Sequence, residues 1–191
     1  MSKLLLDRLK AQFGDKVLET SSFRGDDVAL LDKSVWRAAA TFLRDDARCA
    51  CDYFVDLSVV DFPDEDEDQG RFSVYLIVYS TTKKQRVRIK TRASEANPEI
   101  DSVADVYLGA NWAEREAFDM FGVKFAGHPD LRRILMYEEF VGYPLRKDYP
   151  AQKTQPLIEY REGTMDKLGP FLPDEGMPFD RAPTDPKNFS H

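Results

Sequence analysis

Apolar residues recur at helical spacing in two stretches near the start of the chain, and each stretch predicts an amphipathic helix. Residues 1–13 carry four leucines between charged positions. Their acidic Asp7 argues against a mitochondrial targeting peptide. Residues 34–46 begin at Ser34, the predicted N-cap, and their apolar side chains lie three and four positions apart at Val35, Ala38, Ala39, Phe42 and Leu43.

Four further stretches are typical of strands: 27–32, 53–62, 72–79 and 85–92. Residues 72–79 are almost entirely apolar, which predicts a central strand covered on both faces. Residues 85–92 alternate strictly, with Val87 and Ile89 on one face and four basic side chains on the other, Arg86, Arg88, Lys90 and Arg92. That basic row is either a solvated outer face or a docking face for an acidic partner. We favour the solvated face, because charged outer faces are ordinary.

A third helix is predicted over residues 98–109. Pro98 begins it and Gly109 ends it. Its apolar face consists of Ile100, Val103, Val106 and Tyr107.

A fourth helix is predicted over residues 112–121. Asn111 is its predicted cap, and Glu114 stands at N3, from which its side chain can return to the cap. Gly122 follows at the position where a left-handed residue ends a helix. Together, the helices and strands predict an α+β domain over residues 1–150, with a mixed sheet of about four strands and packed helices.

The chain changes character after Pro150. Residues 151–191 contain six of the eleven prolines, and their apolar residues are scattered without a period. Such a segment cannot bury a core of its own. We therefore predict a long irregular C-terminal tail that docks on partner subunits through isolated apolar side chains, Leu157, Ile158, Tyr160, Phe171, Leu172 and Phe179.

Charge and composition argue against several classes of function. The formal net charge of −7 disfavours a nucleic-acid binder or a direct binder of anionic membranes. No apolar stretch approaches the ~20 residues that span a bilayer, so we expect any membrane association to go through partners. The chain has only two cysteines, Cys49 and Cys51, and two histidines, one of them the terminal His191, so we expect no metal centre. The acidic run at 64–68 predicts a solvated hairpin loop.

Residues 111–150 are rich in charged side chains, and two interpretations compete for them. In the first, they form an acid/base or metal site from Glu114, Glu116, Asp119 and His128. Acids at positions i, i+2 and i+5 of a helix do not share one face, which argues against this interpretation. In the second, charged side chains form buried or interfacial ion pairs that fix irregular loops. Arg115 and Asp119, four residues apart, are a candidate pair.

The string from Trp112 to Pro150 closely resembles the signature region of the 30 kDa subunit (the C-type subunit) of proton-pumping NADH:quinone oxidoreductase, respiratory complex I. The family's Glu-Arg-Glu motif and following acid, its His-Pro-Asp-Leu-Arg-Arg-Ile-Leu block and its Gly-x-Pro-Leu-Arg-Lys-Asp-Tyr-Pro block are all present. We take the following as family signature and interface residues: Glu114, Arg115, Glu116, Asp119, His128, Pro129, Asp130, Arg132, Arg133, Arg146, Lys147 and Asp148.

The resemblance implies a structural subunit of the peripheral arm, with no catalytic residue and no cofactor of its own. FMN, the Fe–S clusters, NADH and quinone would bind to partner subunits. Electron transfer to quinone and proton translocation would be properties of the whole complex. The implied partners are the quinone-site subunit (D or 49 kDa type) and the terminal-cluster subunit (B type), on the cytoplasmic side of a bacterial inner membrane.

Two alternatives remain open at this point. One is the equivalent subunit of a related membrane-bound hydrogenase, or of a ferredoxin- or F420-dependent complex. The other is a stand-alone acid/base or metal-dependent enzyme. The complete motif at 142–150 favours the NADH:quinone branch.

Overall fold

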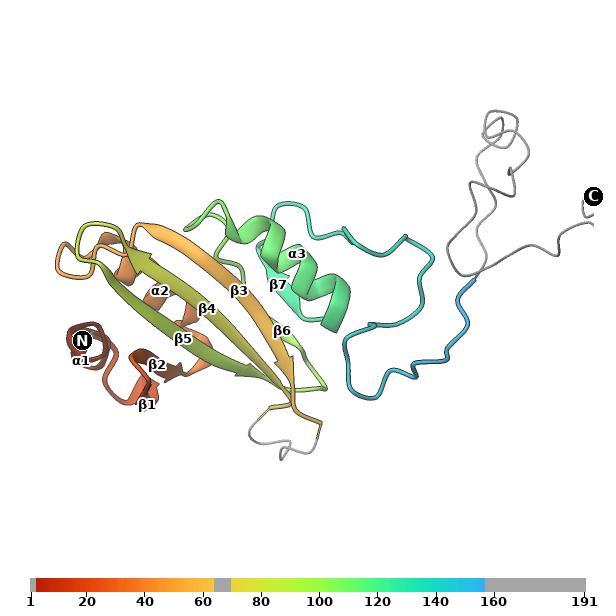
Figure 1. The fold of residues 1–191 in the computed structure, drawn as a ribbon, viewed down its shortest axis with the longest axis horizontal. Helices are drawn as coiled ribbons and strands as arrows, with labels where there is room; N and C mark the ends of the chain where they lie inside the picture. The colour runs from red at the N-terminus through yellow and green to blue at the C-terminus, as the bar shows by residue number, and fades with distance from the viewer. Residues whose placement is uncertain (1–2, 64–69, 157–191) are drawn as a thin grey trace, which may run out of the picture. The chain divides into compact units, whose positions relative to one another are not determined.

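The computed structural model describes residues 3–63 and 70–156 (Figure 1). Its helices are α1 (Lys3–Phe13), α2 (Trp36–Asp45) and α3 (Ala110–Phe121), with short 3-10 helices η1 (Gly14–Lys16) and η2 (Lys33–Val35). Its strands are β1 (Val17–Phe23), β2 (Asp26–Leu31), β3 (Tyr53–Asp61), β4 (Phe72–Ser80), β5 (Gln85–Ala93), β6 (Glu99–Asp101) and β7 (Lys124–Ala126). The acidic run at 64–68 and the predicted tail from residue 157 onward lie outside the described residues.

Five strands form one mixed sheet in the order β1-β2-β5-β4-β3. Strands β2 and β5 are parallel and the other neighbours are antiparallel, while β6 and β7 form a separate parallel pair. The predicted α+β class is confirmed, but the sheet has five strands rather than about four. The missed strand, β1, lies at the sheet edge and buries none of its side chains fully, so its sequence lacks the apolar alternation that marks a strand.

One face of the sheet is buried against helices α1 and α2. The inward side chains of β4 and β5 are fully buried at Val74, Leu76, Val78, Val87 and Ile89. They share a core with Leu5 and Leu9 of α1 and with Trp36 and Leu43 of α2, and Figure 1 shows α2 behind the sheet. The outward side chains of Tyr75, Ile77 and Tyr79 in β4 are only half-buried, so most of this strand is fully covered on one face rather than on both as predicted.

The start of α2 differs from the prediction, because Asp32 and not Ser34 caps this region. The carboxylate of Asp32 accepts a hydrogen bond from the backbone N–H of Ser34 (2.9 Å), and the turn η2 precedes the helix. Aspartate has the same capping chemistry as serine, and a 3-10 turn at a helix start shifts the cap by a residue or two.

The predicted helix after Pro98 is wrong. Residues Glu99–Asp101 form strand β6, in which Ile100 lies opposite Phe125 of β7. The apolar residues expected on the face of that helix are nevertheless buried, Ile100 in β6 and Val103, Val106 and Tyr107 in the irregular stretch before α3. Asn111 is likewise not a cap, because it lies inside α3, which begins without a side-chain cap.

Helix α3 ends at Gly122, as predicted. This glycine has a left-handed backbone (φ 77°), and its N–H donates to the carbonyl oxygen of Phe118 (2.9 Å). A Cβ atom at this position would lie 2.5 Å from Cε2 of Tyr143. Backbone conformation and packing therefore both require glycine here.

We expect Gly122→Ala to lower the free energy of unfolding by about 3 kcal/mol, since it adds a steric clash to left-handed strain. The matched control is Gly25→Ala, because Gly25 has φ 89° but nothing within 4 Å of the place that a Cβ atom would occupy. The control should lose only about 1 kcal/mol. Urea unfolding of both variants measures the difference, and equal losses would contradict the packing argument.

Candidate interaction site

The charged residues of the family signature fix an irregular segment to the folded core. This segment, residues 127–150, follows β7 and is called the signature segment below (Figure 1). It contains no helix or strand, so most of its backbone N–H groups lack ladder partners. Two buried carboxylates, Asp119 and Asp61, accept hydrogen bonds from several of them.

Asp119 on α3 binds the middle of the signature segment. Its side chain is fully buried and accepts the backbone N–H groups of three consecutive residues, Ile134 (3.1 Å), Leu135 (2.8 Å) and Met136 (2.9 Å). The guanidinium of Arg133 donates to its other oxygen at 2.7 Å. Burial alone would raise the pKa of Asp119, but these donors outweigh burial and hold the pKa below its ordinary value.

Asp61, at the end of β3, binds the last part of the segment. Its fully buried side chain forms a two-pronged pair with Arg71 (2.7 and 2.9 Å) and accepts the backbone N–H of Lys147 (2.7 Å). Arg71 also pairs with Asp148 (2.9 Å) and with Glu95 (2.7 Å). Burial opposes ionisation of Asp61, but the bonds from Arg71 and Lys147 outweigh it and lower the pKa.

Arg146 closes the segment against the end of α3. Its Nε donates to the carbonyl oxygen of Phe121 (2.6 Å), which has no partner within the helix. Its guanidinium lies over two aromatic rings, 4.9 Å from the centroid of Phe72 and 4.5 Å from that of Tyr143. A helix terminus, a strand and the segment thus meet at one arginine.

The predicted pair between Arg115 and Asp119 does not form, and Arg115 supports the segment in another way. It donates to the carbonyl oxygens of Arg132 (3.2 Å) and Arg133 (3.4 Å), and its guanidinium lies 5.0 Å from the ring centroid of Trp112. The prediction failed because backbone groups of the segment engage both side chains instead.

Glu114 has an internal structural role. Its fully buried carboxylate accepts hydrogen bonds from the Ser102 hydroxyl (2.6 Å) and from the Val103 backbone N–H (2.7 Å). These bonds tie α3 to the turn after β6. The sequence had instead predicted that the Glu114 side chain would bind the N-cap of its own helix. Burial raises the pKa of Glu114 to about 7, against the opposing effect of the two hydrogen bonds.

The remaining signature residues lie at the surface or in a turn. The His128 ring accepts the Asp130 N–H at Nδ1 (3.0 Å), so Nε2 carries the proton and donates to the Asn111 carbonyl (3.1 Å). Asp130 and Arg132 form an exposed pair (2.9 Å). The side chains of Glu116, Pro129 and Lys147 are exposed.

An acid/base or metal site is not assembled from these residues. Glu114 and Asp119 are buried in separate hydrogen-bond networks, while Glu116 is exposed on another face of the helix. Within residues 3–63 and 70–156, no group of three or more His, Cys, Asp or Glu side chains could hold a metal ion.

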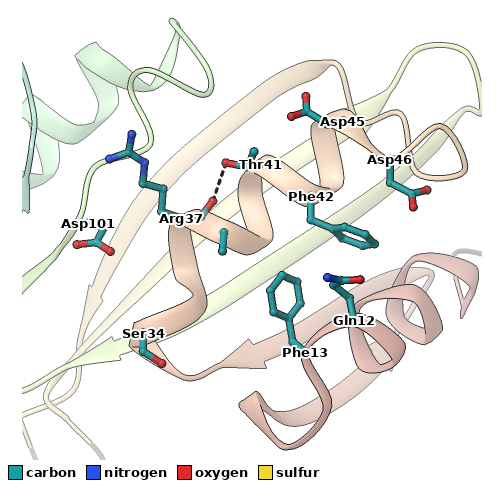
Figure 2. Close-up of a pocket in the computed structure, with 10 residues that line it drawn as sticks. Gln12, Phe13, Ser34, Arg37, Thr41, Phe42, Asp45, Asp46 and Asp101 are labelled. Atoms are coloured by element: carbon teal, nitrogen blue, oxygen red, sulfur yellow. Dashed lines mark hydrogen bonds between the residues drawn. The ribbon is translucent and has the colours of Figure 1, made fainter.

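A hollow of about 780 Å³ lies between α1 and α2, and Figure 2 shows its lining. The rings of Phe13 and Phe42 meet there edge to face, with centroids 5.8 Å apart. Three of its four charged lining residues are engaged in ion pairs, Arg37 with Asp105, Asp46 with Arg8, and Asp45 with Arg44. The fourth, Asp101, is exposed.

Sequence reasoning missed Asp61 and Arg71 entirely. They flank the acidic run at 64–68, far in sequence from the signature, and no spacing rule connects them to Lys147. The one available signal was a charged residue next to an apolar strand, since Asp61 ends β3 and Arg71 immediately precedes β4. That signal is weak, because strand ends are commonly charged.

We expect Asp119→Ala to lower the free energy of unfolding by about 3 kcal/mol, since Arg133 and three backbone N–H groups lose their acceptor. Limited proteolysis should then cleave within 131–149 first. Glu116→Ala on the same helix removes an exposed carboxylate and should change stability by less than about 0.5 kcal/mol. Equal stability of the two variants in urea unfolding would refute the role of Asp119.

Glu114→Gln should change how stability depends on pH. The folded-state pKa of Glu114, about 7, lies above the ordinary value of 4.5, so its contribution is complete below pH 4.5 and is lost as the pH rises through 7. The loss amounts to about 3 kcal/mol. The glutamine variant cannot ionise, so its free energy of unfolding, measured with urea, should rise relative to that of the wild type between pH 5 and pH 8. Glu116→Gln is the control, and a Glu114→Gln curve parallel to the wild type would disprove the assignment.

Comparison with known proteins places the signature in a family. The model of a family described as "Respiratory-chain NADH dehydrogenase, 30 Kd subunit" matches residues 29–155. The chain is 41% identical over 145 residues to the C-type subunit of NADH-quinone oxidoreductase from Geotalea uraniireducens (strain Rf4), an alignment that covers 76% of this chain and 85% of that protein. It is 49% identical over 113 residues to the corresponding subunit from Sinorhizobium medicae (strain WSM419), with coverage of 59% and 54%.

Two solved structures share the fold. A trypsin-resistant fragment of Nqo5 aligns with a TM-score of 0.58 at 23% identity, over 66% of this chain and 99% of that one. A chain of the membrane-bound sulfane sulfur reductase, an archaeal respiratory membrane complex, aligns with a TM-score of 0.60 at 20% identity, over 79% and 86%. At these identities the likeness concerns the fold alone. The family match spans well over half of the sequence, and the chain therefore belongs to the family of the 30 Kd subunit of respiratory-chain NADH dehydrogenase.

Proposed function

We propose that this chain is a scaffolding subunit, without a redox group of its own, in the peripheral arm of a proton-translocating NADH:quinone oxidoreductase. One observation carries the proposal: the charged signature residues are used to shape a surface rather than to form a reactive site. Of the signature residues, Asp119 binds Arg133 and the backbone of the signature segment, and Arg146 binds the backbone at the end of α3. Asp61, outside the signature, binds Arg71 and the backbone of Lys147. Chemistry on a substrate would need some of these groups to be free.

The two cysteines support a role without a redox centre. Cys49 and Cys51 are free thiols, and both are fully buried in the core. Burial raises the pKa of Cys49 to about 11 and that of Cys51 to about 12, which disfavours the thiolate that binds iron or zinc. We therefore assign FMN, the Fe–S clusters, NADH and quinone to partner subunits.

Exposed apolar side chains around α3 and the signature segment offer a contact surface. Trp112 is 65% exposed and lines a hollow of about 530 Å³ together with Met136 and Tyr137. Four aliphatic side chains of this region are more than half exposed: Leu108, Leu135, Val141 and Leu145. Large apolar groups at the surface, supported by a rigid frame, are typical of a protein–protein interface.

We assign this surface to the subunits that form the quinone site (D or 49 kDa type) and hold the terminal cluster (B type). In this proposal the chain keeps them in register, while electrons pass from NADH to quinone through the partners. The complex as a whole would translocate protons. Its position would be the cytoplasmic side of a bacterial inner membrane, reached through partners; in the described part of the chain no helix is long and apolar enough to span a bilayer.

The C-terminal stretch has a proposed role of its own. The chain still contacts the signature segment at Gln155, whose side chain accepts the Val141 N–H (3.0 Å). For residues 157–191, which lie outside the described part, the prediction of an extended docking tail rests on the proline-rich sequence.

The double variant Trp112→Ala with Leu135→Ser tests the contact surface. We expect the tagged variant to fold but to lose partner subunits on purification, with a loss of about 3 kcal/mol or roughly 100-fold in affinity. The matched control is Leu18→Ser with Phe23→Ser, which changes two equally exposed residues on β1. Normal recovery of the partners with the first variant would contradict the proposed surface. Stoichiometric flavin, iron or zinc in the purified chain would contradict the scaffolding role.

A further inference from the structure

A row of basic side chains runs along the middle of the sheet face that turns away from α1 and α2. Val87 and Ile89 of β5 are buried on the helical face, so the alternate residues point to the opposite face, namely Arg86, Arg88, Lys90 and Arg92. Strand β5 is the third of the five strands, which places the row at the centre of the sheet. Figure 1 shows no helix over this face among the described residues.

Apolar side chains border the centre of this row on both sides. Lys90 lies opposite Tyr75 of β4 and Leu30 of β2. Arg88, two residues before Lys90 on β5, is flanked in the same way by Ile77 of β4 and Val28 of β2. Two cations therefore lie in an apolar strip rather than among other charged groups.

Aromatic rings hold these two cations against the sheet. The Nζ atom of Lys90 lies 5.4 Å from the ring centroid of Tyr75 and 5.8 Å from that of Phe62. The guanidinium of Arg88 lies 5.9 Å from the Tyr75 centroid. Both basic side chains are half-buried as a result, although no other described element covers them.

Arg88 and Lys90 have no carboxylate at ion-pair distance within residues 3–63 and 70–156. Arg86, at the end of the row, is paired with Asp26. Asp56 of β3 is on the same face, but it is exposed and Ile77 separates it from Arg88. A cation that is partly removed from water and lacks a counter-charge favours the arrival of an anion.

We propose that this face binds an extended acidic segment of another subunit, whose carboxylates at positions i and i+2 pair with Arg88 and Lys90. The two basic residues are two positions apart on one strand, about 7 Å, and an extended partner presents alternate side chains at the same interval. The arginine fork takes a carboxylate through two hydrogen bonds. The flanking apolar side chains exclude water from the pairs and so strengthen them.

An acidic protein segment fits this face better than a nucleic acid does. The chain has a net charge of −7, which repels a polyphosphate backbone but opposes two carboxylates much less. The face is also distinct from the signature segment, because Asp61, which binds that segment, is buried, whereas this row points outward. The inference therefore adds a second contact to the one proposed above.

Carbodiimide cross-linking of the assembled complex tests this contact. The reagent joins a lysine amine directly to a carboxylate, and the complex would be purified through a tag on this chain. We expect mass spectrometry to find Lys90 joined to an Asp or Glu of another subunit. Arg88→Lys should add a second link, to an acid two residues away in the same segment. Lys90→Arg should lose the first link while the complex stays intact, and the exposed Lys10 of α1 should give no link to that segment.

Four results would overturn the proposal. The first is an assembled complex in which Lys90 has no link to a partner. The second and third are a Lys90 link to the chain's own acidic run at 64–68 and a Lys90 link to a second copy of the chain. The fourth is bound nucleic acid that shields Lys90 from cross-linking until a nuclease removes it. Partner subunits in the purified sample show that assembly itself holds, so a missing link counts against this face alone and not against the scaffolding role.

Discussion

Backbone without helix or strand must find acceptors for its N–H groups, and here two buried carboxylates supply several of them. Asp119 accepts three consecutive N–H groups of the signature segment, and Asp61 accepts a fourth from Lys147. Each carboxylate is balanced by one arginine, Arg133 or Arg71, so that neither charge is buried alone. The shape of the segment, and hence the surface it presents, depends on these bonds.

This arrangement explains how a charged motif can serve contact rather than catalysis. The charged side chains of Asp119, Arg133 and Arg146 face inward or bind neighbouring backbone. The segment turns Leu135, Val141 and Leu145 toward solvent. A partner would therefore meet a preformed apolar surface and would lose little ordering entropy on binding it. Membership of the 30 Kd subunit family agrees with such a role, because that family belongs to a multisubunit respiratory enzyme.

Patterns with a strong local signal were predictable from the sequence. The alternation in β5 and the glycine at the end of α3 needed only neighbouring residues, and both predictions are confirmed. Features decided by distant contacts were not predictable. Strand β1 has no apolar alternation because it is an edge strand, β6 exists only because β7 pairs with it, and Asp119 prefers backbone donors 15 residues away to Arg115 on its own helix. The basic row of β5 was placed on the outer face correctly, but its half-burial depends on rings of β4 and of Phe62.

Amide hydrogen exchange of the intact chain tests the central role of the two carboxylates most directly. The account predicts that the N–H groups of Ile134, Leu135, Met136 and Lys147 exchange as slowly as those in the middle of α3, although they lie in irregular backbone. Exchange of these four groups at the rate of an unstructured peptide would contradict it, since the carboxylates would then not fix the segment.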